Sequence, residues 1–171
     1  MYTIDRHDKV TELHDVPQSS VGAPCPIVLA GEGSLLVAYF VETTPAGWDG
    51  STVRVVGADS AEPAAIVRFT RPYASMFGPP NDEAFSGHPL AKRGLHPYGG
   101  FEVTGSSWIR GLEKMNAVHP YHRSEHFAVY RHFILAFHDT TFERVATGYS
   151  FEYASGPLNE LVSREAAKIH P

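Results

Sequence analysis

Short apolar runs separated by glycine and proline dominate residues 26–70 of the chain. The runs are rich in aliphatic and aromatic residues, and they lie at 27–30, 35–42, 51–56 and 65–70. Gly/Pro-containing stretches separate them and supply turn signals. Runs of this length with such punctuation are typical of antiparallel sheet. The pattern therefore predicts a β-rich N-terminal half.

The strongest local pattern lies in residues 126–153. Two long β-prone runs, 126–137 and 142–153, flank the segment 138–141 and predict a hairpin. Both faces of this hairpin are substantially apolar. Such a pattern favours a central position in a sheet covered on both sides, or the wall of a small barrel.

The turn of this hairpin sets its register. A two-residue turn at Asp139-Thr140 or a four-residue loop gives the same pairing. Phe137 then faces Phe142, and Phe133 faces Ala146. His138 lies at the turn end.

Residues 71–100 interrupt the strand pattern with five prolines and five glycines. The stretch is too irregular for a long element. It is also too rich in Phe, Met and Leu for a linker, so we expect it to pack onto the domain. Long loops of this kind in compact domains are often functional.

Two helices are predicted. Ser106 or Ser107 caps the first, which ends before Pro120, and its apolar face carries residues spaced i, i+4, i+7: Trp108, Leu112 and Met115. The second begins at Pro157, and its apolar stripe consists of Leu158, Leu161, Val162, Ala166 and Ile169. We expect this second helix to cover a sheet face.

These elements predict an α+β fold that is mostly antiparallel β. The expected architecture is a curved sandwich or partly open barrel of six to eight strands with two packed helices. The 171 residues are assigned to a single domain, 1–171, in which residues 1–22 form a loosely ordered lead-in.

Charge and composition narrow the function classes. The net charge is −5, from 14 Lys and Arg against 19 Asp and Glu, and no concentrated basic face is present, so we expect no nucleic-acid partner. No apolar run approaches the ~20 residues of a spanning helix, so we expect no membrane association and a cytoplasmic location. The single cysteine, Cys25, excludes an intramolecular disulfide. Small-molecule binding and homo-oligomerisation stay open as partner hypotheses.

Histidine is unusually frequent. Five of the ten histidines fall between His119 and His138. His132 and His138 share a face of the predicted strand but stand ~20 Å apart at ~3.3 Å per residue, too far to share one ion. The segment His119 to His126 holds three histidines and Glu125, and we interpret it as a solvated approach to the following strand.

A composite site is the better hypothesis. If the 71–100 loop packs over the turn end of the hairpin, it brings Glu83 and His88 toward His138 and Glu143. His88, His138 and Glu143 would form a two-His, one-carboxylate set that suits a divalent metal such as zinc or iron. Without metal, Glu83, His88 and Glu143 are candidate catalytic residues for general acid–base chemistry. The alternative is that His88 and His138 order the loop and the turn structurally.

Two resemblances accompany these motifs. Segments 81–90 (NDEAFSGHPL) and 132–143 (HFILAFHDTTFE) resemble those of a group of bacterial hypothetical proteins of similar length. That resemblance implies no activity. Phe85-Ser86-Gly87-His88-Pro89 is similar to a stretch of phenazine-biosynthesis isomerase-like proteins, which are longer and built from two similar halves, so no catalytic residue is transferred from it.

Two functions follow from the sequence. The first is a small-ligand-binding or divalent-metal-binding domain, with an enzyme using a His/Glu site as its more specific form. The second is a non-enzymatic interaction or scaffolding domain in which the histidines are structural.

Overall fold

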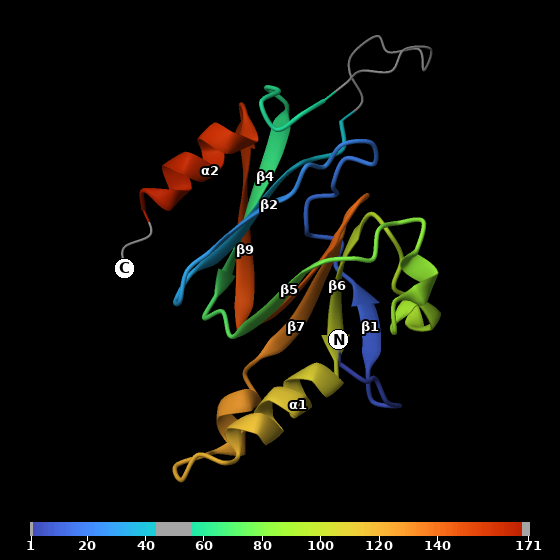
Figure 1. Cartoon of the computed structure of the whole chain (residues 1–171), viewed down its shortest axis with the longest axis vertical. Helices are drawn as coiled ribbons and strands as arrows, with labels where there is room; N and C mark the ends of the chain where they lie inside the picture. The colour runs from blue at the N-terminus through green and yellow to red at the C-terminus, as the bar shows by residue number, and fades with distance from the viewer. Residues whose placement is uncertain (1, 44–55, 169–171) are drawn as a thin grey trace.

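Two antiparallel sheets face one another, and each carries a helix on its outer side (Figure 1). The computed structural model describes residues 2–43 and 56–168. It confirms an α+β fold that is mostly β, and the sheets do not close into a barrel. The predicted run 51–56 lies, apart from its last residue, outside the described residues.

One sheet has five strands in the order β1-β6-β7-β8-β5. Their bounds are β1 (Lys9–Glu12), β6 (Gly99–Thr104), β7 (Arg131–Ala136), β8 (Thr141–Ala146) and β5 (Ala74–Gly78). The other sheet has four strands in the order β2-β3-β4-β9. Their bounds are β2 (Ile27–Ala30), β3 (Leu35–Phe40), β4 (Pro63–Thr70) and β9 (Gly148–Ser155).

The described residues thus form nine strands, where the sequence predicted six to eight. Both β1 and β5 were missed, because one is polar and the other lies in the Gly/Pro-rich stretch. The predicted second arm of the hairpin is divided between the sheets: β8 ends at Ala146, and β9 begins at Gly148 and pairs with β4. The first arm is also shorter than predicted, because Ser124–Phe127 form the 3-10 helix η3.

The hairpin of β7 and β8 exists, but its predicted register is wrong by two residues. Leu135 pairs with Phe142, and Phe133 pairs with Arg144. The cause is the turn, which uses His138 and Asp139 and is closed by the N–H of Phe137 donating to the carbonyl of Thr140 at 2.9 Å. A shift of two leaves the side chains of β7 and β8 on the same faces, because side chains alternate with a period of two.

The main core lies between the two sheets. It joins residues of β3 and β4 to residues of β7 and β8, namely Leu35, Val37, Tyr39, Ala65, Val67, Phe69, Phe133, Leu135, Phe142 and Ala146, with Phe137 from the turn. Aromatic rings interlock across it: Phe69 lies 5.6 Å from Phe142 and 5.9 Å from Phe133. Offset ring contacts of this kind add to the stability from apolar burial.

Helix α2 (Leu158–Ala166) covers the outer face of the four-stranded sheet, as predicted. Leu158 and Leu161 are buried there against Leu36, Ala38 and Phe40. No helix in the described part of the chain has the length and apolar character needed to cross a membrane.

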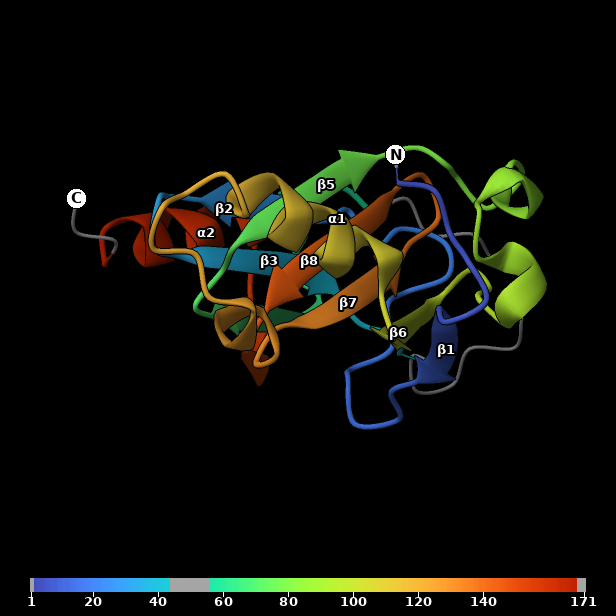
Figure 2. The ribbon, with the colours of Figure 1, turned by 90° about the horizontal axis from the view of Figure 1, so that it is seen from below.

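Helix α1 (Ser107–Asn116) lies on the outer side of the five-stranded sheet (Figure 2). The predicted cap is confirmed, since the Ser106 hydroxyl accepts from the N–H of Ile109 at 3.3 Å. Only the first turn of the predicted apolar face packs closely. Trp108 lies 5.0 Å from the ring of His132, whereas Met115 is 72 % exposed.

Residues 2–22, expected as a loosely ordered lead-in, contribute to the fold. β1 pairs with β6, and Tyr2, Ile4 and Val10 pack against a third apolar cluster on the outer side of this sheet. The buried carboxylate of Asp8 accepts from the N–H groups of Asp5 and Ser107, each at 2.7 Å. Its charge is therefore satisfied by backbone donors instead of water.

The 71–100 stretch packs over the turn end of the hairpin, as the composite-site hypothesis required. The N–H of Asp82 donates to the carbonyl of His138 at 2.8 Å, and Thr141 Oγ1 donates to the carbonyl of Pro80 at 2.9 Å. The stretch contains two 3-10 helices, η1 (Phe85–Gly87) and η2 (Ala91–Arg93).

Candidate functional site

A buried carboxylate, Glu143, is the centre of the most connected polar group in the described residues. It is only 4 % exposed and lies on the outer face of β8, opposite Ile134 of β7. Three donors reach it: Tyr2 Oη at 2.7 Å, His132 Nε2 at 2.9 Å and His88 Nε2 at 3.2 Å. We call these four residues the Glu143 cluster.

In each imidazole ring, the hydrogen-bond partner of Nδ1 bears on whether Nε2 carries the proton that Glu143 accepts. The N–H of Leu90 donates to His88 Nδ1 at 3.1 Å, so Nε2 of His88 carries the proton that Glu143 accepts. His132 Nδ1 lies 3.0 Å from the Ser106 hydroxyl, which can donate to it while capping α1. The hydrogen-bond network thus makes His88 a neutral donor to Glu143, whereas the Ser106 hydroxyl can accompany either protonation state of His132.

Burial and hydrogen bonding act in opposite directions on Glu143. Burial alone would raise the pKa of its carboxyl group, but hydrogen bonds from His132 and His88, the charge of His132 and the hydrogen bond from Tyr2 bring that pKa down to about 2. Burial, with the charge of Glu143 close by, raises the pKa of the Tyr2 phenol. Glu143 is therefore an ionised acceptor surrounded by three hydrogen-bond donors.

This arrangement suits a structural role better than a catalytic or metal-binding one. The side chains of His88 and His132 are 0 % exposed, and all four of their ring nitrogens are engaged. A general base needs to reach the substrate proton, and a metal needs lone pairs that point to a common centre. No group of three or more His, Cys, Asp or Glu among the described residues is arranged to hold a metal ion.

The cluster joins four separate parts of the chain. Tyr2 comes from the N-terminal segment, His88 from the loop after η1, and His132 and Glu143 from neighbouring strands. Ser106 connects the cluster to the start of α1. One ionised side chain therefore helps to hold the whole outer layer on the five-stranded sheet.

Sequence reasoning brought only two of these residues together. His88 and Glu143 were predicted as site residues and do lie in contact. His132 was missed, because the predicted register placed Ala136 opposite Glu143. In the true register Ile134 is opposite, and His132 becomes a diagonal neighbour of Glu143 on the same face. Nothing in the sequence pattern pointed to Tyr2.

The other two predicted site residues belong to a separate group at the turn end. His138 Nδ1 bonds Asp139 at 2.9 Å, and its ring centre lies 6.2 Å from that of Tyr98. Asp82 accepts a hydrogen bond from the Tyr98 hydroxyl. Glu83 is exposed beside them. The predicted metal ligands His88, His138 and Glu143 are thus divided between two groups, as are the predicted catalytic residues Glu83, His88 and Glu143.

Acidic neighbours raise the pKa values of two side chains near the turn, His138 and Cys25. The hydrogen bond with Asp139, together with the charges of Asp82, Asp139 and Glu83, raises the pKa of His138. Burial, followed by the charge of Asp139, raises the pKa of the half-buried Cys25 thiol. Cys25 is therefore held in its neutral form and is not an activated nucleophile.

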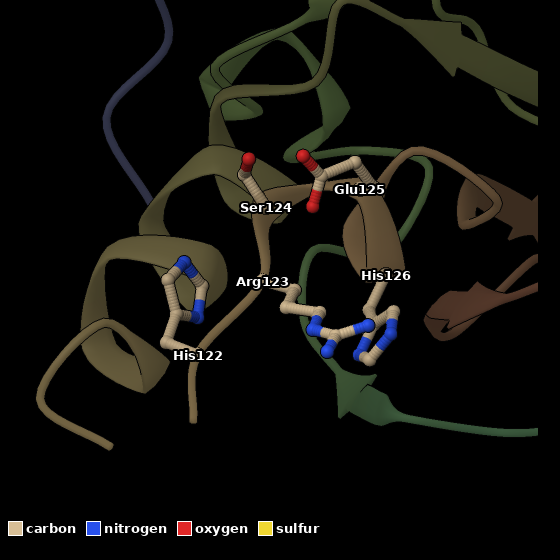
Figure 3. Close-up of a pocket in the computed structure, with 5 residues that line it drawn as sticks. All are labelled: His122, Arg123, Ser124, Glu125 and His126. Carbon is tan, nitrogen blue, oxygen red and sulfur yellow. The ribbon is translucent and has the colours of Figure 1, made fainter. Parts of the chain in front are cut away.

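The histidine-rich segment lines a surface hollow. His122, Arg123, Ser124, Glu125 and His126 enclose about 580 Å³, and Figure 3 shows Arg123 and His126 extending to the same side of the segment. His122 is held by Glu113 at 2.6 Å and by Asn116 at 3.0 Å.

A second hollow of about 380 Å³ shares Glu125 and His126 with the first. Its further lining consists of Arg71, Tyr73, Asn116, Phe127, Val129 and Tyr130. We call the two together the cationic hollow. Tyr73 forms its aromatic wall, with ring centres 5.3 Å from Phe127 and 5.0 Å from Tyr130.

Both arginines of this hollow have guanidinium groups that no described residue contacts through a hydrogen bond or ion pair. The side chains of Arg71 and Arg123 are exposed and make no hydrogen bond or ion pair with the described residues. Arg71 also has a φ of +47°, a backbone conformation that a non-glycine residue rarely adopts. Strained residues of this kind are concentrated at functional sites.

Comparison with protein-family models, with curated proteins and with solved structures finds no match to this chain.

Proposed function

We propose that this protein binds a small ligand carrying an anionic group and a flat ring, and that the ligand occupies the cationic hollow. The observation that carries the proposal is a pair of guanidinium groups without a partner among the described residues: Arg71 lines the second hollow with Tyr73 and Tyr130, and Arg123 lines the adjoining first hollow. The protein is otherwise acidic, with a net charge of −5.

The lining chemistry defines the ligand class. Guanidinium groups form paired hydrogen bonds with carboxylate or phosphate oxygens, and they bind anions more strongly than neutral acceptors. Aromatic side chains offer stacking surfaces for a planar ring. The second hollow, at about 380 Å³, is within the ~300–1,000 Å³ range of small-ligand pockets.

The Glu143 cluster has no part in this proposal, because its polar atoms are occupied by one another. The zinc or iron set of His88, His138 and Glu143 stays a prediction that the described contacts do not support.

Calorimetric titration with charged and uncharged probes tests the proposal. We expect AMP and naphthoate to bind, and adenosine and naphthol to bind at least tenfold more weakly. Arg123→Met and Arg71→Met should each weaken AMP binding about tenfold, since a charge-assisted hydrogen bond contributes ~1.5–3 kcal/mol. Arg164→Met, a change of an exposed arginine on α2, is the matched control and should have no effect. Absence of binding by both anions, or equal binding by the control and test variants, would overturn the proposal.

A second candidate is a non-enzymatic interaction domain, and exposed apolar side chains favour it. Of the nine exposed large hydrophobic side chains among the described residues, Tyr73 and Val129 line the second hollow, and Met115, Val118 and Tyr121 lie in the segment that leads to His122. Val118 is 89 % exposed and Tyr121 is 83 % exposed. Exposed apolar groups gathered in one region mark protein contacts more often than scattered ones do.

Self-association is the form of this second candidate that can be tested directly. Light scattering over a range of concentrations should give a mass that increases with concentration in the wild type. The double change Val118→Ser and Tyr121→Ser should abolish that increase. A constant monomer mass for the wild type would contradict self-association through this surface.

A further inference from the structure

Tyr2 is a half-buried phenol that reaches the Glu143 cluster from the N-terminal segment. Its ring is stacked on Trp108, with ring centres 5.7 Å apart and planes inclined by 6°. It also meets the ring of His132 edge-on at 5.3 Å, and its hydroxyl donates to Glu143 Oε2 at 2.7 Å. We call Trp108, His132 and Glu143, which together surround this phenol, the phenol slot.

The walls of the phenol slot are held in place by contacts that do not involve Tyr2. His132 Nε2 bonds Glu143 at 2.9 Å, and His132 Nδ1 lies 3.0 Å from the Ser106 hydroxyl. Trp108 belongs to the first turn of α1, which Ser106 caps, and its ring centre lies 5.0 Å from that of His132. A site whose walls are already fixed binds a ligand without the cost of ordering them.

Few contacts hold residues 2–4, the stretch that carries the phenol. These residues belong to no strand, and their backbone groups bond no other backbone group in the described part of the chain. Ile4 is only partly buried, and Thr3 is exposed. Segments with so few backbone hydrogen bonds open at a low free-energy cost.

The turn that follows, residues 5–8, is anchored. The buried Asp8 carboxylate accepts from the N–H groups of Asp5 and Ser107, each at 2.7 Å. The Arg93 guanidinium group donates to the carbonyl of Asp8 at 2.9 Å. Residues 2–4 therefore form a strap that is fixed at this turn and lies over a slot built from other parts of the chain.

We propose that the phenol slot is a binding site for a small uncharged phenol, and that the strap closes it by placing Tyr2 where the ligand binds. An indole face accepts the ring of such a ligand, and an ionised carboxylate accepts its hydroxyl proton in a charge-assisted hydrogen bond. The same carboxylate disfavours an anionic ligand, because like charges repel at short distance. The site thus differs in ligand class from the cationic hollow.

The probe is p-cresol, whose methyl group stands in the place of the tyrosine Cβ, and p-methylanisole is the matched control because it lacks the donor hydrogen. We expect p-cresol to bind the full-length Tyr2→Ala variant at least tenfold more tightly than the wild type, since no phenol of the chain competes with it. In an NMR titration it should shift the indole N–H signal of Trp108. Thr3→Ala, a change of an exposed strap residue, should leave the wild-type affinity unchanged.

The wild type tests displacement of the strap directly. As p-cresol is added up to its solubility limit, the ring signals of Tyr2 should move to those of a solvated tyrosine, and p-methylanisole should not move them. Arg71→Met and Arg123→Met should keep this response, so failure of this proposal is distinguishable from failure of the cationic hollow.

Three results would overturn the proposal: equal affinity of Tyr2→Ala and the wild type for p-cresol, equal binding of p-methylanisole, or Tyr2 signals that stay unchanged in the wild type. The wild-type signals decide the matter even if Tyr2→Ala does not fold.

Discussion

At the scale of single residues, the Glu143 carboxylate couples stability to pH. Its folded pKa of about 2 is below the ordinary value of 4.5, so the folded state favours the ionised form. A depressed carboxyl pKa contributes stability that is fully present above the unfolded pKa and is lost as pH falls through the folded pKa. The window for Glu143 therefore runs from about pH 4.5 down to about pH 2.

Glu143→Gln is the corresponding prediction. The substitution should cost roughly 1–3 kcal/mol at neutral pH, because an amide nitrogen then faces buried donors. Urea unfolding at a series of pH values should show the difference from wild type shrinking below pH 4.5. The exposed Glu32→Gln is the control, with an expected change within ~0.5 kcal/mol. A difference that is constant down to pH 2 would show that ionisation of Glu143 is irrelevant to stability.

A second prediction at this scale concerns His138, whose contribution to stability changes with pH in the opposite direction to that of Glu143. Its hydrogen bond with Asp139 raises its pKa, so any stability it contributes is present below its unfolded pKa of 6.5 and is lost as pH rises through the folded value. An NMR titration should find His138 titrating above 6.5, and Asp139→Asn should lower that pKa. Asp59→Asn, far along the chain from His138, should leave it unchanged. An unaltered titration in Asp139→Asn would contradict the assigned cause.

At the scale of elements, the alternation of side chains was more predictable than the register. The sequence assigned the apolar residues of β7 and β8 to their correct faces, because side chains of a strand alternate with a period of two. The register was wrong, because a two-residue turn at His138 and Asp139 cannot be distinguished by composition from one at Asp139 and Thr140. An error of two residues preserved the faces but hid the diagonal contact between His132 and Glu143.

The N-terminal segment is another element that sequence reasoning could not place. Most of its residues are polar, and some of their partners lie far along the chain: the Asp8 carboxylate accepts from the N–H of Ser107, and the carbonyl of Asp8 accepts from the Arg93 guanidinium group. Such contacts leave no periodic pattern in a sequence. The contact between segments 2–8 and 105–107 could therefore not be predicted from the sequence.

A substitution at Gly105 tests how tightly the N-terminal segment packs against residues 105–107. A Cβ added there would lie 2.3 Å from the carbonyl oxygen of His7, and its φ is +61°. Gly105→Ala should lower the unfolding free energy by at least ~2 kcal/mol, from left-handed backbone strain and displacement of the segment. Gly111→Ala on α1 is the matched control, because nothing lies within 4 Å of the added atom. It should stabilise by ~0.5–1 kcal/mol. Similar effects of both changes in urea unfolding would contradict tight docking.

At the scale of the whole molecule, the layer arrangement was predictable and the sheet membership was not. Two apolar faces on one hairpin indicated a central strand pair covered on both sides, and the core and outer layer confirm this. The division of 142–153 between two sheets was missed, because a strand that changes sheets keeps its β-prone composition. Only the pairing of β9 with β4 shows the crossing.

The same layering predicts opposite effects for two adjacent residues. Glu143 accepts hydrogen bonds in the outer layer, whereas Arg144 alternates with core residues on the inner face, and its buried Nε has no hydrogen-bond partner among the described residues. Glu143→Gln should destabilise the protein, and Arg144→Met should stabilise it, because one change breaks a satisfied network and the other removes a buried donor that has no acceptor.

If the layers are independent, the double variant should equal the sum of the single changes within ~0.5 kcal/mol. Urea unfolding of the four proteins in this cycle measures the coupling. A coupling above ~1 kcal/mol would mean that the two faces of β8 do not contribute independently to the stability of the sandwich.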